Sequence, residues 1–184
     1  MHQKTDALYE LLEKIIANDQ EAFRKLYDLT HKQLYAYLMR ILRDQDMAED
    51  VVVETYTAIW QGAKTFKGRS KVQTWMFGIA RNLALNALKK IRHHSSLDDF
   101  QHLAANGGLA NGGTERKDMI AKALLKLSPK HREVLDLVFY QGFIYTEIAD
   151  ILGTSVNTVK TRIFYAKKAL SEILDQMGVK QDDI

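Results

Sequence analysis

The sequence predicts an all-α protein of two small helical domains joined by a flexible linker, with a helix-turn-helix in the second domain. Only one proline and ten glycines occur among 184 residues. Helices exclude both residue types from their interiors, whereas sandwiches and barrels need many turns. The segment before Lys117 contains two Gly-Gly pairs and no sustained apolar stripe, which indicates a linker. We therefore predict domains at 1–92 and 117–184 and the linker at 93–116.

Apolar residues at helical spacing predict a series of helices in the first domain. The expected ranges are 5–17, a segment that starts after Asp19, 30–42, 47–62 and 73–90. Asp19 is a candidate N-cap for the second of these helices. Asp46, followed three residues later by Glu49, is expected to open the long helix that Gly62 ends.

The second domain carries helix start and stop signals at short intervals. Helices are expected at 118–127, 130–140, 147–152 and 156–174. The expected caps are Ser128-Pro129, Thr146 and Ser155, and the expected stops are Gly142 and Gly153. Two helices joined by a three-residue turn that carries a glycine are typical of a helix-turn-helix.

Charge is distributed unevenly along the first domain. No Asp or Glu occurs between Thr55 and Leu97, whereas 44–54 holds five acids and no Lys or Arg. A polyanion such as nucleic acid is attracted to the first segment and repelled by the second, so the acidic segment fits a basic protein surface. The alternative interpretation is that both are ordinary solvated helix faces.

Aromatic residues are interleaved with the cations of the acid-free segment. Phe66, Trp75 and Phe77 fall among its lysines and arginines. Single-stranded nucleic acid needs cations for its phosphates and flat apolar surfaces for its unstacked bases. Because aromatic residues at helical spacing usually pack in cores, we expect Trp75 and Phe77 to be partly buried.

A second acid-free segment, 151–171, coincides with the last predicted helix. Its inward stripe is expected to be Val156, Val159, Ile163, Ala166 and Leu170. Its outward set is then Asn157, Thr158, Lys160, Thr161, Arg162 and Tyr165. This set fits a major groove, where Arg162 can make a bidentate contact with guanine and Lys160, Lys167 and Lys168 can neutralise phosphates.

Three blocks of the sequence resemble regions 2 and 4 of the extracytoplasmic-function (ECF) sigma factors, which belong to the sigma-70 family of bacterial RNA polymerase. They are "AFRKLYDLTHKQLYAYLMRILRDQDMAEDVVVETYTAIW", "KVQTWMFGIARNLALNALKK" and "LSPKHREVLDLVFYQGFIYTEIADILGTSVNTVKTRIFYAKKAL". The resemblance implies that the first domain binds the clamp coiled coil of core RNA polymerase and recognises and melts the minus-ten element. It implies that the second domain binds the polymerase flap and reads the minus-thirty-five element.

The resemblance also implies roles for individual residues. The polymerase-binding candidates are Asp46, Glu49, Asp50 and Glu54. The minus-ten DNA-binding candidates are Lys64, Phe66, Lys67, Arg69, Lys71, Trp75, Arg81 and Asn82. The minus-thirty-five candidates are Ser155, Asn157, Thr158, Lys160, Thr161, Arg162 and Tyr165. Three sites depart from the family: Val53 stands where Gln is common, Lys89-Lys90 stands where Arg is frequent, and Ser128-Pro129 stands where Leu-Pro is usual.

Further expectations follow from the resemblance and the composition. The family implies control by a separate anti-sigma factor, no enzymatic activity and no cofactor. The absence of cysteine excludes disulfides and thiolate metal sites and favours a reducing compartment. Neither a signal peptide nor a membrane span is visible in the sequence, so we expect a cytoplasmic protein.

Two other function classes stay open. An ordinary helix-turn-helix regulator with a sensing or dimerising first domain would bind duplex DNA tightly by itself. A metal-dependent enzyme could use His93, His94 and His102 with Asp98 and Asp99, but these residues fall in or beside the predicted linker, which offers no fixed ligand geometry. "NGGLANGG" lacks the preceding strand that a phosphate-binding glycine loop needs.

Overall fold

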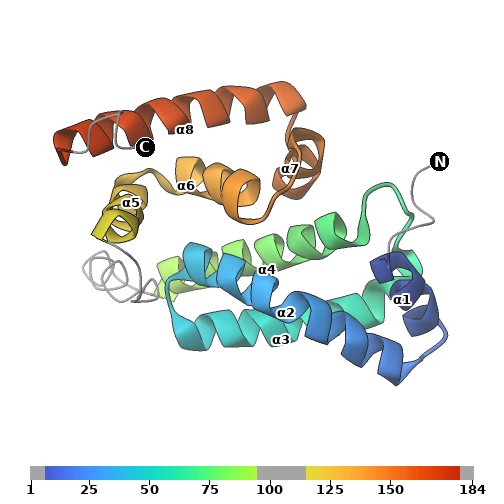
Figure 1. Cartoon of the computed structure of the whole chain (residues 1–184). Coiled ribbons are helices and arrows are strands. Elements are labelled where there is room, and N and C mark those ends of the chain that lie inside the picture. Colours follow the sequence, from blue (N-terminus) through green and yellow to red (C-terminus); the bar gives the residue numbers. More distant parts are fainter. Residues whose placement is uncertain (1–6, 95–114, 179–184) are drawn as a thin grey trace. The chain divides into compact units, whose positions relative to one another are not determined.

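A computed structural model describes residues 7–94 and 115–178, and these residues form two compact units. The first unit holds α1 to α4, and the second holds α5, α6, α8 and the greater part of α7 (Figure 1). No strand occurs within the described residues. The predicted all-α fold is therefore confirmed.

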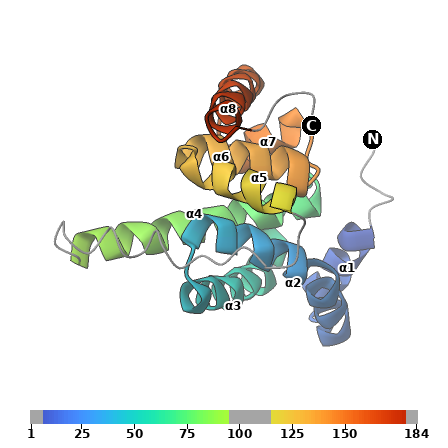
Figure 2. The ribbon, with the colours of Figure 1, turned by 60° about the vertical axis from the view of Figure 1, so that its left-hand side comes forward.

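The first unit is a bundle of four α-helices and one short 3-10 helix. These are α1 (Ala7–Ile16), α2 (Gln20–Leu42), α3 (Gln45–Gly62), η1 (Ala63–Thr65) and α4 (Val72–His94). The helices α2, α3 and α4 lie side by side, and α1 packs against α2, η1 and α4 (Figures 1 and 2). The largest side chains of their shared core are Tyr37, Phe77, Leu26, Leu34, Leu38, Ile59 and Met76.

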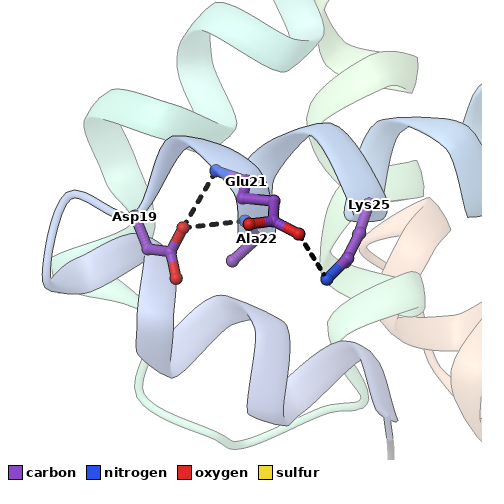
Figure 3. Close-up of polar contacts among 4 residues, drawn as sticks. All are labelled: Asp19, Glu21, Ala22 and Lys25. Carbon is purple, nitrogen blue, oxygen red and sulfur yellow. Dashed lines mark hydrogen bonds and ion pairs between the residues drawn. The ribbon is translucent and has the colours of Figure 1, made fainter.

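The start of α2 confirms the N-cap prediction. The Asp19 carboxylate accepts hydrogen bonds from the backbone N–H groups of Glu21 (2.9 Å) and Ala22 (3.0 Å). In the first turn, Glu21 forms an ion pair of 2.8 Å with Lys25, which lies one turn further along the helix (Figure 3). Because Glu21 and Lys25 are exposed, this pair adds little stability, and the cap sets the start of the helix.

The prediction of a separate helix at 30–42 is wrong, since α2 runs unbroken from Gln20 to Leu42. Thr30 is a typical capping residue, but here it is buried in the middle of the helix. Its hydroxyl lies 2.6 Å from the Leu26 carbonyl oxygen and 2.7 Å from the Tyr56 hydroxyl of α3. A tertiary contact therefore uses the group that would otherwise have capped a new helix.

The boundaries of α3 and α4 also differ from the predicted ones. Asp44 caps α3 by accepting a hydrogen bond of 2.8 Å from the Met47 N–H, so Asp46 does not open the helix. The α3 helix ends at Gly62 as predicted, but it continues directly into η1 and Gly62 keeps a negative φ of −91°. The α4 helix extends one turn beyond the expected end, to His94.

Gly78 lies in the interior of α4, where glycine is unfavourable. Glycine destabilises a helix interior by about 0.5–1 kcal/mol relative to alanine because the unfolded chain has more freedom to lose. The structure offers no internal reason for it: Gly78 is absent from the residues with positive φ, and a Cβ built there meets no heavy atom within 4 Å.

The helices after residue 114 are α5 (Glu115–Lys126), α6 (Pro129–Leu135), η3 (Asp136–Tyr140), α7 (Tyr145–Leu152) and α8 (Val156–Gln176). The helix predicted at 130–140 is present, but its second half, η3, is a π-helix. Ser128 caps α6 with Pro129 in its first turn, as predicted. The Arg132 guanidinium donates to the carbonyl oxygens of Leu124, Leu125 and Leu127 at 2.8–3.0 Å, and so satisfies the otherwise unpaired end of α5.

The turns around α7 follow the sequence signals with one exception. Gly142 and Gly153 have positive φ angles of 72° and 61°, which favour glycine. The predicted cap at Thr146 is wrong, because α7 already starts at Tyr145. Instead, Glu147 stabilises the start of α7, because its carboxylate accepts a hydrogen bond of 3.0 Å from the Ile144 N–H. None of the helices in the described ranges has the length and apolar content that a bilayer crossing needs.

Candidate polymerase-docking and nucleic-acid surfaces

The outward side of α3 carries a negatively charged surface, which we call the acidic face. Its carboxylates are those of Asp46, Glu49, Asp50 and Glu54, all of them exposed. The opposite side of the helix buries Val51, Val52, Thr55 and Ile59 in the core. Among the residues that the structure describes, none of the four carboxylates takes part in an ion pair. The acidic face is therefore available to a cationic partner.

Val53 lies in the middle of the acidic face. It is 67% exposed, and it is three or four residues from Glu49, Asp50 and Thr57, which places all of them on one side of the helix. An exposed valine among carboxylates gives this surface an apolar centre with a charged rim. Protein-binding surfaces commonly have this arrangement.

The segment 64–71 joins α3 to α4 and forms a cationic loop. Lys64, Lys67, Arg69 and Lys71 are all exposed. Gly68 has a φ of 63° at the centre of the loop, a conformation that glycine adopts without strain. Four cations on one short loop create a positive potential that suits a phosphate backbone.

Aromatic rings hold this cationic loop against the bundle. The ring of Phe66 lies 5.1 Å from that of Trp75 in α4 and 6.4 Å from that of Tyr9 in α1, measured between centroids. Phe66 and Trp75 are half-buried, so each combines packing with an accessible edge. Phe77 is 1% exposed and its ring lies 5.0 Å from that of Tyr37 in a tilted arrangement, so it belongs to the core and is not available to DNA.

Tyr9 is a residue of this site that the sequence did not reveal. Tyr9 lies far from the cationic loop in the sequence, in a helix that has neither a cluster of like charges nor a recognisable motif. The contact with Phe66 exists only because α1 packs against η1. No sequence pattern indicates such a tertiary contact.

The outward face of α4 continues the cationic surface. Asn82, Lys89 and Lys90 are exposed, and Arg81 is half-buried. Lys71, Gly78, Asn82 and Lys89 follow one another at intervals of four or seven residues, which keeps them on one side of the helix. The buried residues Met76, Ala80 and Ala84 occupy the other side.

The outward side of α8 presents hydrogen-bonding groups to solvent. Ser155, Asn157, Lys160, Thr161 and Tyr165 are exposed, and Thr158 and Arg162 are half-buried. Of the predicted inward stripe, Val159, Ile163 and Ala166 are buried, whereas Val156 and Leu170 are only half-buried. The structure therefore brings the predicted set together on one face.

The first turn of α8 uses two of these groups internally. The Ser155 hydroxyl accepts a hydrogen bond of 3.1 Å from the Thr158 N–H, and the two hydroxyl oxygens lie 2.8 Å apart. Ser155 thus caps the helix as predicted. Asn157, Thr161 and Arg162 are polar side chains of this face that take no part in this cap.

Two exposed aromatic side chains beside this face were not predicted from the sequence. Phe164 is 65% exposed and Phe139 is 60% exposed, and the Lys167 ammonium lies 5.3 Å from the centre of the Phe139 ring. The position of Phe164, one residue after the inward Ile163 in a helix, could have indicated its exposure. The sequence gives no comparable signal for Phe139. This residue lies in the π-helix η3 that continues α6, and the α-helical spacing of buried positions does not carry over into it.

No metal site is found in the described part of the chain. Within 7–94 and 115–178, no group of three His, Asp or Glu side chains could hold a metal ion. His102, Asp98 and Asp99 lie outside the described residues, and so do the side chains of His93 and His94.

Two family models match the chain. The Sigma-70 region 2 model matches residues 26–94, and the Sigma-70, region 4 model matches residues 117–170. The first segment contains α3, the cationic loop and α4, and the second contains the helix-turn-helix. The α1 helix with Tyr9 precedes both segments.

Curated relatives match over most of the chain. The ECF RNA polymerase sigma factor SigL of Mycobacterium tuberculosis (strain CDC 1551 / Oshkosh) is 31% identical over 168 residues, which cover 89% of this chain and 94% of that protein. The ECF RNA polymerase sigma factor SigK of M. tuberculosis (strain ATCC 25618 / H37Rv) is 27% identical over 175 residues, covering 90% and 92% of the two chains.

Solved structures with a similar fold include two protein complexes. CnrH, solved in complex with the cytosolic domain of CnrY, matches with a TM-score of 0.70 and 26% identity, over 93% of this chain and 99% of that one. The sigma factor RpoE of Bartonella quintana, solved with the anti-sigma factor NepR, matches with a TM-score of 0.66 and 27% identity, over 83% and 96% of the two chains.

Proposed function

Because the chain belongs to the family of ECF RNA polymerase sigma factors, we propose that its two units divide promoter recognition between them. As a sigma factor it acts with core RNA polymerase and directs promoter-specific initiation of transcription. The resemblance seen in its sequence blocks is thus confirmed. Within the first unit, the observation that assigns polymerase and DNA to separate surfaces is the opposite charge of the acidic face and the cationic loop.

The acidic face of α3 is the polymerase-docking surface in this proposal. Asp46, Glu49, Asp50 and Glu54 would attract a basic part of the polymerase clamp coiled coil, and they would repel DNA. Val53 would supply apolar contact at the centre, where the family commonly has Gln. A charged rim around an apolar centre supports a specific, reversible interface.

The cationic loop and α4 form the strand-reading surface. Lys64, Lys67, Arg69 and Lys71 would hold the phosphates of an opened DNA strand, and the accessible parts of the Phe66 and Trp75 rings would stack with its bases. Unpairing a base costs a few kcal/mol, and stacking on an aromatic side chain returns about 1–3 kcal/mol. These two terms nearly balance, which suits a reversible opening step at the minus-ten element.

The outward face of α8 reads duplex DNA in this account. Arg162 would contact guanine through two hydrogen bonds, and Asn157 and Thr161 would contact other base edges. Lys160 and Lys168 would neutralise phosphates on either side. This face corresponds to the minus-thirty-five reader of the family, and the same unit would bind the polymerase flap.

The remaining parts of the proposal concern organisation and regulation. We assign the domains to 1–92 and 117–184 with the linker at 93–116, and we infer that the protein has no enzymatic activity of its own. It works in the cytoplasm, where RNA polymerase acts. Control by an anti-sigma factor is supported by the relative RpoE, which was solved with the anti-sigma factor NepR.

Selection from a randomised promoter library tests this function. Core RNA polymerase is incubated with the full chain and a pool of duplex DNA that varies at both promoter elements, and transcribed sequences are recovered. We expect two conserved elements that appear only when both proteins are present. Tight binding of the chain to duplex DNA without polymerase would instead favour an ordinary helix-turn-helix regulator.

A further inference from the structure

Gly78 occupies the middle of the strand-reading face without any need from the fold. Its φ is not positive, and a Cβ built on it meets no heavy atom within 4 Å. An alanine there would therefore fit, and it would favour the helix. Neither backbone conformation nor internal packing accounts for the glycine.

The neighbours of Gly78 on α4 belong to the strand-reading surface proposed above. Trp75 lies one turn before it and Asn82 one turn after it on the same side of α4. Trp75 is half-buried, with its ring 5.1 Å from that of Phe66, and Asn82 is exposed. A strip of bare backbone thus lies between an aromatic ring and an amide.

A missing side chain allows a ligand to approach a helix more closely. Glycine is the usual residue where a backbone must come near a ligand. The flat face of an unpaired base, or its sugar, could lie against the Gly78 backbone with Trp75 on one side and Asn82 on the other. A methyl group at this position would hold that ligand away from α4.

We propose that Gly78 positions the opened DNA strand by letting one nucleotide contact the α4 backbone between Trp75 and Asn82. The proposal rests on the function proposed above for the cationic loop and α4. It adds a positioning residue that carries no charge and no hydrogen-bonding side chain. Its role would come from the space it leaves empty.

The test compares Gly78→Ala and Gly78→Leu with the unaltered chain in the polymerase holoenzyme. The DNA probe is a promoter recovered from the randomised library, with a fluorescent base analogue in its minus-ten element to report opening. Asn82→Ala serves as the reference for the strand-reading face. Ala7→Leu adds three of the four carbons that Gly78→Leu adds, at an exposed position of α1, and serves as the control. Affinity for core polymerase and the thermal midpoint are measured for every variant.

We expect Gly78→Ala to slow promoter opening about tenfold and Gly78→Leu to slow it further, through the loss of a nucleotide contact. The thermal midpoint of Gly78→Ala should stay equal or rise by a few degrees, about 2–8 °C. Affinity for core polymerase should not change, and Ala7→Leu should open the promoter at the normal rate.

Three results would overturn the proposal in distinguishable ways. If both Gly78 variants open the promoter normally while Asn82→Ala is slow, the strand-reading face stands and the role of Gly78 is wrong. If Asn82→Ala also opens normally, the assignment of this face to DNA fails, and the role of Gly78 fails with it. A loss of opening in Gly78→Ala that is matched by a loss of core affinity would likewise contradict a contact with the strand.

Discussion

The helices α3 and α4 are neighbours in one bundle, yet their outer faces are opposite in charge. Both bury an apolar stripe in the same core, with Ile59 from α3 and Met76 from α4 among the largest buried side chains. The outward side of α3 carries four exposed carboxylates, and the loop before α4 carries four exposed cations. Packing therefore leaves the outer faces free to differ in sequence, and we propose that their charges direct them to different partners.

The aromatic content of the two surfaces differs in the same direction. The acidic face has the aliphatic Val53 at its centre, whereas the cationic loop has Phe66 and Trp75. Aliphatic surface suits a protein partner, and rings suit unstacked bases. The comparison implies that each surface can be damaged without the other.

Charge reversal on the acidic face should give the largest effect. Asp50→Lys should lower affinity for core polymerase about 10- to 100-fold, because it opposes a basic partner at the interface. The fold should be intact, since Asp50 is exposed. Affinity is measured by titration of labelled core enzyme. Asp28→Lys, the same change at an exposed position of α2, is the control, and equal losses in both would mean that net charge alone matters.

Removal of the Phe66 ring from the cationic loop should affect promoter opening alone. Phe66→Ala should slow opening of the minus-ten element about 5- to 100-fold, the value of one stacked base, with affinity for core polymerase unchanged. Tyr9→Ala removes the ring that packs against Phe66 and should have a smaller effect, through loop mobility. Promoter opening at the normal rate in Phe66→Ala would show that this ring only packs.

Single cations should separate backbone contact from base reading. Lys67→Ala should weaken binding to all promoters alike and reduce the slope of log affinity against log salt by about one, the signature of one lost phosphate contact. Arg162→Ala should cost about 1–3 kcal/mol and only at particular base pairs of the minus-thirty-five element. Salt titrations on a set of promoter variants distinguish the two. Identical profiles would contradict the division of roles.

The last prediction concerns the core that both surfaces share, and its effect appears only at high pH. Burial raises the pKa of Tyr56 to about 12, although its hydrogen bond with Thr30 opposes the shift. A raised pKa favours the neutral phenol in the folded state, so its stabilising contribution is present below pH 10 and disappears as the pH approaches 12. The free energy of unfolding should fall about 2 kcal/mol more over this interval in the natural chain than in Tyr56→Phe. Denaturant unfolding at several pH values measures it, and parallel curves would contradict the shift.

Local chemistry explains which parts of the fold were predictable. Asp19, Ser128 and Ser155 cap helices because each side chain reaches an N–H two or three residues away. Thr30 and Thr146 have the same chemistry but do not cap. In Thr30 the hydroxyl is used by Leu26 and Tyr56, a use that depends on how α3 packs and that the sequence cannot show.

The candidate site also has features that local sequence predicts and features that depend on tertiary packing. Its charges could be predicted, because exposed acids and bases on helix faces follow from residue type and spacing, and all four predicted carboxylates are exposed. The partial burial of Phe66 and its contact with Tyr9 could not, since they depend on the packing of α1. The open space around Gly78 could not be predicted either, because the sequence alone does not show whether other atoms lie close to a glycine.

Photo-crosslinking from both surfaces in one open complex tests the central claim most directly. A photoreactive amino acid is placed at Val53 or at Lys67 in the holoenzyme on promoter DNA, and the crosslinked partner is identified. The account predicts that position 53 captures the largest subunit of polymerase and position 67 captures DNA. Capture of DNA from position 53, or of polymerase alone from position 67, would contradict it.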